Sequence, residues 1–206
     1  DLTRDTIGGF NSMIEKEKKL DVDAHVTTVL FNDQYKMLYN RRELKDVRKM
    51  TDKDYTPGGM TALLDAVGRT IHKMDMVSGI HRKDKGNKVL FVIITDGEEN
   101  DSREYTYADV KKLIKDRQEN AGWEFIFLGA NIDAAAAAEN LGIDRDRAVK
   151  YKNTGSGVRA NFKAVAELSD SLAKSGRVSD EWKETVEKDE DDAADKQSAA
   201  VTLHRR

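Results

Sequence analysis

The chain has 206 residues, 38% hydrophobic and 35% charged, which allows one folded domain with a tail and differs from the apolar-poor composition of disordered proteins. Its formal net charge of −3, from 35 basic and 38 acidic residues, leaves no positive excess to hold a phosphate backbone, so nucleic acid is a poor candidate partner. The lack of cysteine excludes a disulfide framework, a thiolate zinc site and a cysteine nucleophile.

The N-terminal quarter predicts one helix followed by a hairpin. Residues 2–20 carry apolar side chains at helical spacing, with Lys and Glu on the opposite face. Residues 24–31 are rich in β-branched side chains and end at Asn32-Asp33, a turn signal, before a second short run at 35–39. We therefore expect an amphipathic helix and then two antiparallel strands joined by a tight turn.

The middle of the chain predicts a helix and the most apolar strand. The Pro-Gly-Gly sequence at 57–59 breaks the chain, and Thr61 is a candidate cap for a helix whose apolar residues follow at helical spacing. Residues 89–94 form the strongest apolar run, which is continuous and not alternating. Such a run predicts a strand buried on both faces, in the middle of a parallel sheet covered by helices.

Helices and strands alternate through the rest of the domain. We expect them at residues 107–119 (helix), 123–128 (buried strand), 134–141 (helix), 149–151 (edge strand) and 158–172 (helix). This alternation predicts an α/β fold with a doubly wound (Rossmann-like), mostly parallel sheet and helices on both faces. From Gly176 the chain turns charged and acidic, so we expect a domain at 1–175 and a flexible or weakly helical tail at 176–206.

Two loops at predicted strand ends carry the chemistry. In a doubly wound sheet, ligands bind outside the carboxyl ends of the strands. The strand at 89–94 delivers Asp96 to that edge, where Gly97 permits a sharp turn, and the loop at 56–63 presents the hydroxyl of Thr61 at the start of a helix. A carboxylate, a hydroxyl and several waters suit a magnesium-sized cation. Thr61 and Asp96 are therefore the predicted ligands of Mg²⁺, or of Mn²⁺ or Ca²⁺.

At these residues the chain resembles the von Willebrand factor A domain family. The resemblance spans roughly the first 175 residues and rests on four segments: GGFN at 8–11, PGGMTALLDAVG at 57–68, VIITDGEEN at 92–100 and WEFIFLGAN at 123–131. The family's metal-ion-dependent adhesion site joins an Asp-x-Ser-x-Ser loop, a Thr loop and an Asp loop. By this match Thr61 and Asp96 take the second and third roles.

The chain departs from the family pattern at its start. No Asp-x-Ser-x-Ser occurs, and the chain begins where the family's first helix begins, so the family's central first strand is missing as well. A segment preceding the chain, a strand from another chain, or an incomplete metal site would each account for this. We expect the first, because losing a central strand leaves two buried strand edges unpaired.

The resemblance implies a binding module and not an enzyme. With little negative charge around it, the cation would stay electrophilic and take an acidic side chain from a partner protein. The rim expected to meet that partner comprises Gly59, Met60, Gly97, Glu98, Glu99 and Asn100. Asp96 also has a simpler interpretation, as a turn residue that accepts backbone hydrogen bonds.

Two other functions stay open at this stage. One is a structural subunit of an assembly with a degenerate metal site, which the missing Asp-x-Ser-x-Ser favours. The other is a Mg²⁺-dependent hydrolase, against which stand the lack of an Asp-x-Asp pair and of a lysine-bearing phosphate loop. No apolar run approaches the length of a membrane span and no leader opens the chain, so we expect a cytoplasmic protein without a span.

Overall fold

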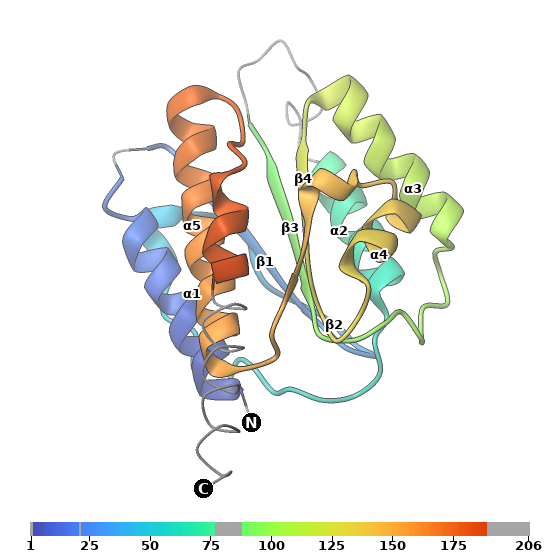
Figure 1. Cartoon of the computed structure of the whole chain (residues 1–206), viewed down its shortest axis with the longest axis horizontal. Helices are drawn as coiled ribbons and strands as arrows, with labels where there is room; N and C mark the ends of the chain where they lie inside the picture. The colour runs from blue at the N-terminus through green and yellow to red at the C-terminus, as the bar shows by residue number, and fades with distance from the viewer. Residues whose placement is uncertain (1, 21, 77–87, 189–206) are drawn as a thin grey trace, which may run out of the picture.

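A computed structural model describes residues 2–20, 22–76 and 88–188 of the chain (Figure 1). In chain order its helices and strands are α1 (Thr3–Glu17), β1 (His25–Phe31), β2 (Tyr35–Glu43), α2 (Leu63–Asp75), β3 (Leu90–Thr95), α3 (Tyr107–Asp116), β4 (Glu124–Ala130), α4 (Ala134–Leu141), β5 (Ala148–Tyr151) and α5 (Gly155–Ser175). Short helical turns lie at Leu44–Asp46, Arg117–Ala121 and Arg145–Arg147. The class is therefore mixed α/β, as the sequence predicts.

The strands form two separate ladders. β1 and β2 pair antiparallel, with Phe31 opposite Tyr35 at the turn, which confirms the predicted hairpin. β3, β4 and β5 form a parallel sheet in that order, with Thr95 opposite Gly129 and Ala130 opposite Tyr151. Because parallel neighbours end at the same edge, the loops that follow β3, β4 and β5 lie together at the carboxyl edge of this sheet.

Successive side chains of β4 enter two different apolar clusters. Phe125 and Phe127 pack with residues of α2, α3 and α4, whereas Ile126 and Leu128 pack with residues of α5. In Figure 1, α1 and α5 lie to one side of β3 and β4, and α2, α3 and α4 lie to the other. The period of two in a strand thus lets one strand anchor helices in two directions.

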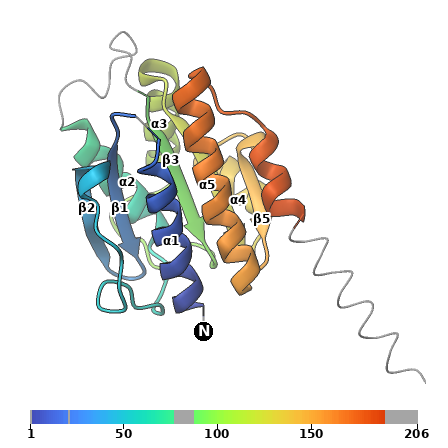
Figure 2. The ribbon, with the colours of Figure 1, turned by 90° about the vertical axis from the view of Figure 1, so that its left-hand side faces the viewer.

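β3 corrects one of the sequence predictions. The strand at 89–94 was expected in the middle of the sheet, but among the described strands β3 pairs with β4 alone. Only Ile93 and Thr95 of β3 are buried, while six of the seven residues of β4 are. A continuous apolar run reports packing on two faces and does not report backbone pairing at two edges. The β1–β2 hairpin lies on the side of β3 away from β4 (Figure 2).

Residues beyond the predicted domain boundary also join the core. Val178, Trp182 and Val186 are buried in the cluster of α5, and residues 181–188 are helical. The remaining part of the expected tail, 189–206, lies outside the described residues. None of the described helices combines the length and the apolar character that a membrane crossing needs.

Candidate metal site

Asp96 stands at the point where β3 reaches the carboxyl edge of the sheet. Thr95 closes the strand with a tight turn, because its Oγ1 donates to the carbonyl of Gly97 at 3.0 Å. Asp96 is exposed, and no hydrogen bond to its carboxylate is recorded within the described residues. From the loop after β4, Asn131 Nδ2 donates to the Asp96 carbonyl at 3.5 Å. The Asp96 carboxylate is therefore free to bind a ligand.

The structure brings Thr61 to the same place. A Cβ atom added to Gly97 would lie 3.1 Å from Thr61 Oγ1, so the hydroxyl of Thr61 is in contact with the residue that follows Asp96. The turn that leads to Thr61 requires glycine, since Gly58 and Gly59 adopt positive φ angles of 118° and 91°. The Thr61 hydroxyl therefore lies against the turn that follows Asp96, and a shared cation between the two residues stays a prediction.

Thr61 is not the cap of α2, contrary to one of the predictions. The helix begins at Leu63, its N-cap is Ala62, and no side chain of that cap residue bonds to the helix. Instead Glu99 Oε2 accepts the backbone N–H of Leu64 at 2.9 Å. A carboxylate at this position neutralises unpaired amides and also suits the positive end of the helix dipole. Glu99 therefore leaves the Thr61 hydroxyl available.

Glu99 and Asn100 of the predicted rim connect the two loops. Asn100 Oδ1 accepts the N–H of Thr61 at 2.7 Å, and the Asn100 N–H donates to the Thr61 carbonyl at 3.0 Å. Glu99 Oε1 accepts the N–H groups of Asp101 and Ser102 at 3.0 and 2.7 Å. Their side-chain oxygens are thus used inside the protein, and a contact of either residue with a partner stays a prediction.

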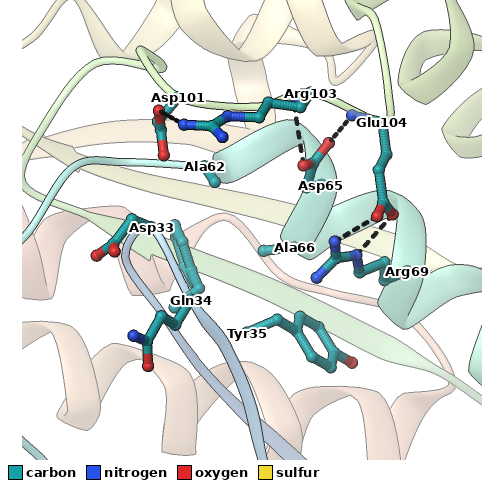
Figure 3. Close-up of a pocket in the computed structure, with 11 residues that line it drawn as sticks. Asp33, Gln34, Tyr35, Ala62, Asp65, Ala66, Arg69, Asp101, Arg103 and Glu104 are labelled. Carbon is teal, nitrogen blue, oxygen red and sulfur yellow. Dashed lines mark hydrogen bonds and ion pairs between the residues drawn. The ribbon is translucent and has the colours of Figure 1, made fainter.

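Asp65 was not singled out by the sequence, yet it holds the same loop. It is 6% exposed on α2, and its carboxylate accepts the backbone N–H groups of Arg103 at 3.0 Å and Glu104 at 2.9 Å (Figure 3). It also accepts the N–H of Tyr105 at 3.0 Å. Burial opposes ionisation, but these three bonds and the nearby Arg69 outweigh it, so the pKa of Asp65 is lowered. The available signal was a carboxylate within the apolar run LLDAV.

The outer surface of the site is partly apolar. Met60 is 50% exposed and Tyr107 is 43% exposed, and Gly59 and Glu98 are exposed as well. Burial, and then the charges of Glu99 and Glu98, raise the pKa of Tyr107, which places its phenol near these carboxylates. Met60 and Glu98 belong to the predicted rim, whereas no sequence pattern indicated Tyr107, the first residue of α3.

Two further phenols lie within electrostatic reach of Asp96. Burial raises the pKa of Tyr151, and the charge of Asp96 adds to that rise. Burial also raises the pKa of Tyr55, opposed by a hydrogen bond with Thr6 and assisted by Asp96. Tyr151 belongs to β5 and Tyr55 to the segment before Thr61, so side chains from two parts of the chain lie within electrostatic reach of Asp96.

Few side-chain oxygen atoms at this site could bind a metal ion. Among the described residues, no group of three or more His, Cys, Asp or Glu side chains is arranged to hold a metal ion. A cavity of about 260 Å³ adjoins the Thr61 loop, between the hairpin turn and α2, but its guanidinium groups are already paired: Arg69 with Glu104 and Arg103 with Asp101. The contact of the Thr61 hydroxyl with Gly97, beside Asp96, is the observation at this edge that bears on a cation site.

Comparisons with known proteins give a structural similarity and no sequence match. No family model matches the chain, and no curated protein matches it. Among solved structures it is similar to "von Willebrand factor type A from Catenulispora acidiphila", with 12% sequence identity and a TM-score of 0.48. The match covers 81% of this chain and 38% of that chain, so this chain spans well under half of that protein's length. The function is therefore argued from the residues of the site.

Proposed function

We propose that this chain is a cytoplasmic, metal-ion-dependent protein-binding module of the von Willebrand factor A type, and not an enzyme. Asp96 and Thr61 hold Mg²⁺, or Mn²⁺ or Ca²⁺, directly or through water, and an acidic side chain of a partner protein takes an open coordination position. The observation that carries this proposal is the contact of the Thr61 hydroxyl with Gly97, beside a carboxylate that has no other recorded bond.

The donor set fits a hard cation that keeps several waters. Carboxylate and hydroxyl oxygens are ligands that Mg²⁺ accepts, and a single carboxylate neutralises only part of its charge. When bound, the cation would supply an electrophilic centre for a carboxylate of the partner. Asp96 would provide the negative charge that retains the cation, and Thr61 would orient it. Met60 and Tyr107 would give the partner apolar contact area beside the charged contact.

We also propose that a further strand lies between β1 and β3 and completes a doubly wound sheet with helices on both faces. In the described residues β1 pairs only with β2, and β3 only with β4, so each has an unpaired edge. The loop following a strand inserted there, parallel to β3, would reach the carboxyl edge beside Asp96. That loop would supply further oxygen ligands, from a preceding segment of the same protein or from another chain.

Cation titration of matched variants tests the proposal. We expect calorimetry to detect Mg²⁺ or Mn²⁺ binding, and we expect Asp96→Ala and Thr61→Ala to weaken it by about tenfold or more. Asp144→Ala is the matched control, because Asp144 is exposed and precedes β5, at the opposite edge of the sheet. Asp96→Ala and Thr61→Ala should also weaken partner binding, and Asp144→Ala should not. Equal binding by the wild type and Asp96→Ala would end the proposal.

The second candidate, a structural subunit with a degenerate metal site, is favoured by one observation. Among the described residues, no group of three or more His, Cys, Asp or Glu side chains could hold a metal ion. This alternative predicts no cation binding by the wild type and partner binding that does not change when Asp96 is replaced. Both results come from the same titrations.

A further inference from the structure

Two carboxylates tie the start of α2 to the loop that follows β3, and they do so in opposite directions. Glu99 extends from the loop to α2, where its Oε2 accepts the N–H of Leu64 at 2.9 Å. Asp65 extends from α2 to the loop and accepts the N–H groups of residues 103–105. We refer to Asp65, Glu99 and Ser102, with their bonds, as the latch.

Ser102 joins the two halves of the latch. Its Oγ donates to Glu99 Oε2 at 2.7 Å and accepts the N–H of Asp65 at 3.1 Å. The Ser102 N–H donates in turn to Glu99 Oε1 at 2.7 Å. All four carboxylate oxygens of Asp65 and Glu99 are therefore bonded to the opposite element or to the loop, which fixes how the loop lies on α2.

The position of the latch connects it to the metal site. Thr61 precedes Asp65 by four residues, and Asp96 precedes Glu99 by three. Each candidate ligand is therefore within one helical turn or one short loop of a latch carboxylate. Asn100 makes two hydrogen bonds with the backbone of Thr61, one through its side-chain oxygen and one through its own N–H. Around the latch lies an outer pair, Arg69 with Glu104, which is exposed and does not touch the Thr61 segment (Figure 3).

We propose that Asp65 and Glu99 are positioning residues for the candidate cation site: they hold the Thr61 hydroxyl against the Asp96 turn, so that losing either one weakens cation binding in a protein that stays folded. This inference rests on the proposed function as far as the cation is concerned. Neither residue binds the cation, since their oxygens are committed to backbone N–H groups and to Ser102. Their role is to hold the two loops in a fixed position relative to each other.

A cross-linking assay tests the positioning without any metal. The chain contains no cysteine, and Thr61 Oγ1, where the sulfur of a cysteine would lie, is 3.1 Å from a Cβ at Gly97. Side chains this close can form a disulfide. In the double variant Thr61→Cys/Gly97→Cys we expect rapid disulfide formation. Adding Asp65→Asn or Glu99→Gln should slow it severalfold. Arg69→Gln breaks the outer pair and removes a positive charge near Asp65, but it leaves every hydrogen bond of the latch in place. It is therefore the matched control and should leave the rate unchanged.

A cation titration of the single variants completes the test. Asp65→Asn and Glu99→Gln should weaken Mn²⁺ binding by about tenfold, whereas Arg69→Gln should not, at a temperature where circular dichroism shows each protein folded. Should Asp65→Asn fail to fold, Ser102→Ala takes its place, because it removes the hydroxyl that joins the two carboxylates. Adding Ser102→Ala should likewise slow cross-linking and weaken Mn²⁺ binding.

The outcomes separate this inference from the proposed function. Slower cross-linking together with weaker Mn²⁺ binding supports both. Unchanged cross-linking overturns the positioning role, even where Mn²⁺ affinity falls, because the carboxylates would then act by charge alone. If cross-linking slows in the latch variants while the wild type binds no Mn²⁺, the positioning role stands and the proposed function fails.

Discussion

At the scale of single residues, Asp65 and Glu17 are buried carboxylates whose pKa values shift in opposite directions. Asp65 is ionised and bonded to three backbone N–H groups, and its pKa is lowered. Glu17 lies 8% exposed on α1, where one oxygen accepts the hydroxyl of Ser169 at 2.7 Å and the other has no partner. Burial, and then the charge of Asp170, raise its pKa against the effect of that hydrogen bond.

Asp65 should matter for stability as well as for the site. A group with a lowered pKa contributes stability above its unfolded pKa of about 3.9, and that contribution is lost as the pH falls through the folded pKa. We expect Asp65→Asn to lower the free energy of unfolding by about 2–4 kcal/mol at neutral pH, because buried amides lose a charged acceptor. Urea denaturation measures this, and the difference should shrink in acid. A variant as stable as the wild type would contradict the assignment.

Glu17 should behave in the opposite way. Because its folded pKa is raised, its stabilising contribution is present at low pH and is lost as the pH rises from about 4.3 through the folded pKa. Glu17→Gln keeps an acceptor for Ser169 and removes the buried charge, so it should raise the melting temperature at neutral pH and have little effect near pH 4. Thermal melts between pH 4 and neutral pH show whether the change in melting temperature is positive. A Gln variant that melts lower at neutral pH would refute it.

At the scale of elements, patterns that depend on local chemistry were predictable and long-range pairing was not. The α4 helix has the predicted bounds, and the hairpin turn contains Asn32 and Asp33, as expected. The α5 helix begins earlier than predicted, at Gly155, because Thr154 caps it through the N–H of Gly157. The position of β3 at the end of its sheet could not be read from its apolar run, since strand order depends on partners elsewhere in the chain.

The packing of α1 on α5 gives an element-scale prediction. A Cβ at Gly9 would overlap the ring of Phe162, whereas a Cβ at Gly8 meets nothing. We expect Gly9→Ala to destabilise the protein by about 1–3 kcal/mol through overpacking. Gly8→Ala should be neutral or slightly stabilising, since alanine favours a helix. Thermal melts of the pair measure the difference, and equal effects at the two positions would mean that the helices do not meet at Gly9.

At the scale of the whole molecule, β1 and β3 each have one edge that pairs with none of the described strands, and β3 leads directly to Asp96. Hydrogen exchange of the backbone amides can detect these edges. We expect the N–H groups of β3 that face away from β4 to exchange faster than those of β4, which is paired on both edges. Supplying the missing strand, in a longer protein or as a peptide, should slow them. Equal protection of β3 and β4 in the 206-residue chain would contradict the open edge.

The candidate site was predictable only in part, and the reason is again long-range. Thr61 and Asp96 each follow a recognisable local pattern, a glycine turn before a helix and an Asp-Gly after a strand. Asp65 and Asn131 act on distant parts of the chain: the Asp65 bonds span 38 to 40 residues, and the Asn131 bond to Asp96 spans 35. The position of Asp65 in the apolar run LLDAV did not indicate these partners. Glu99 and Asn100 lay in a predicted rim, but the sequence did not indicate their inward hydrogen bonds.

The central claim is that Asp96 and Thr61 share one cation. Anomalous diffraction from crystals grown with Mn²⁺ tests it most directly, because the ion is located independently of any assumed ligand. We predict one strong anomalous peak between the Asp96 carboxylate and the Thr61 hydroxyl, coordinated directly or through a single water. A peak at another place, or an Asp96 carboxylate directed away from Thr61 with no ion between them, would contradict the account.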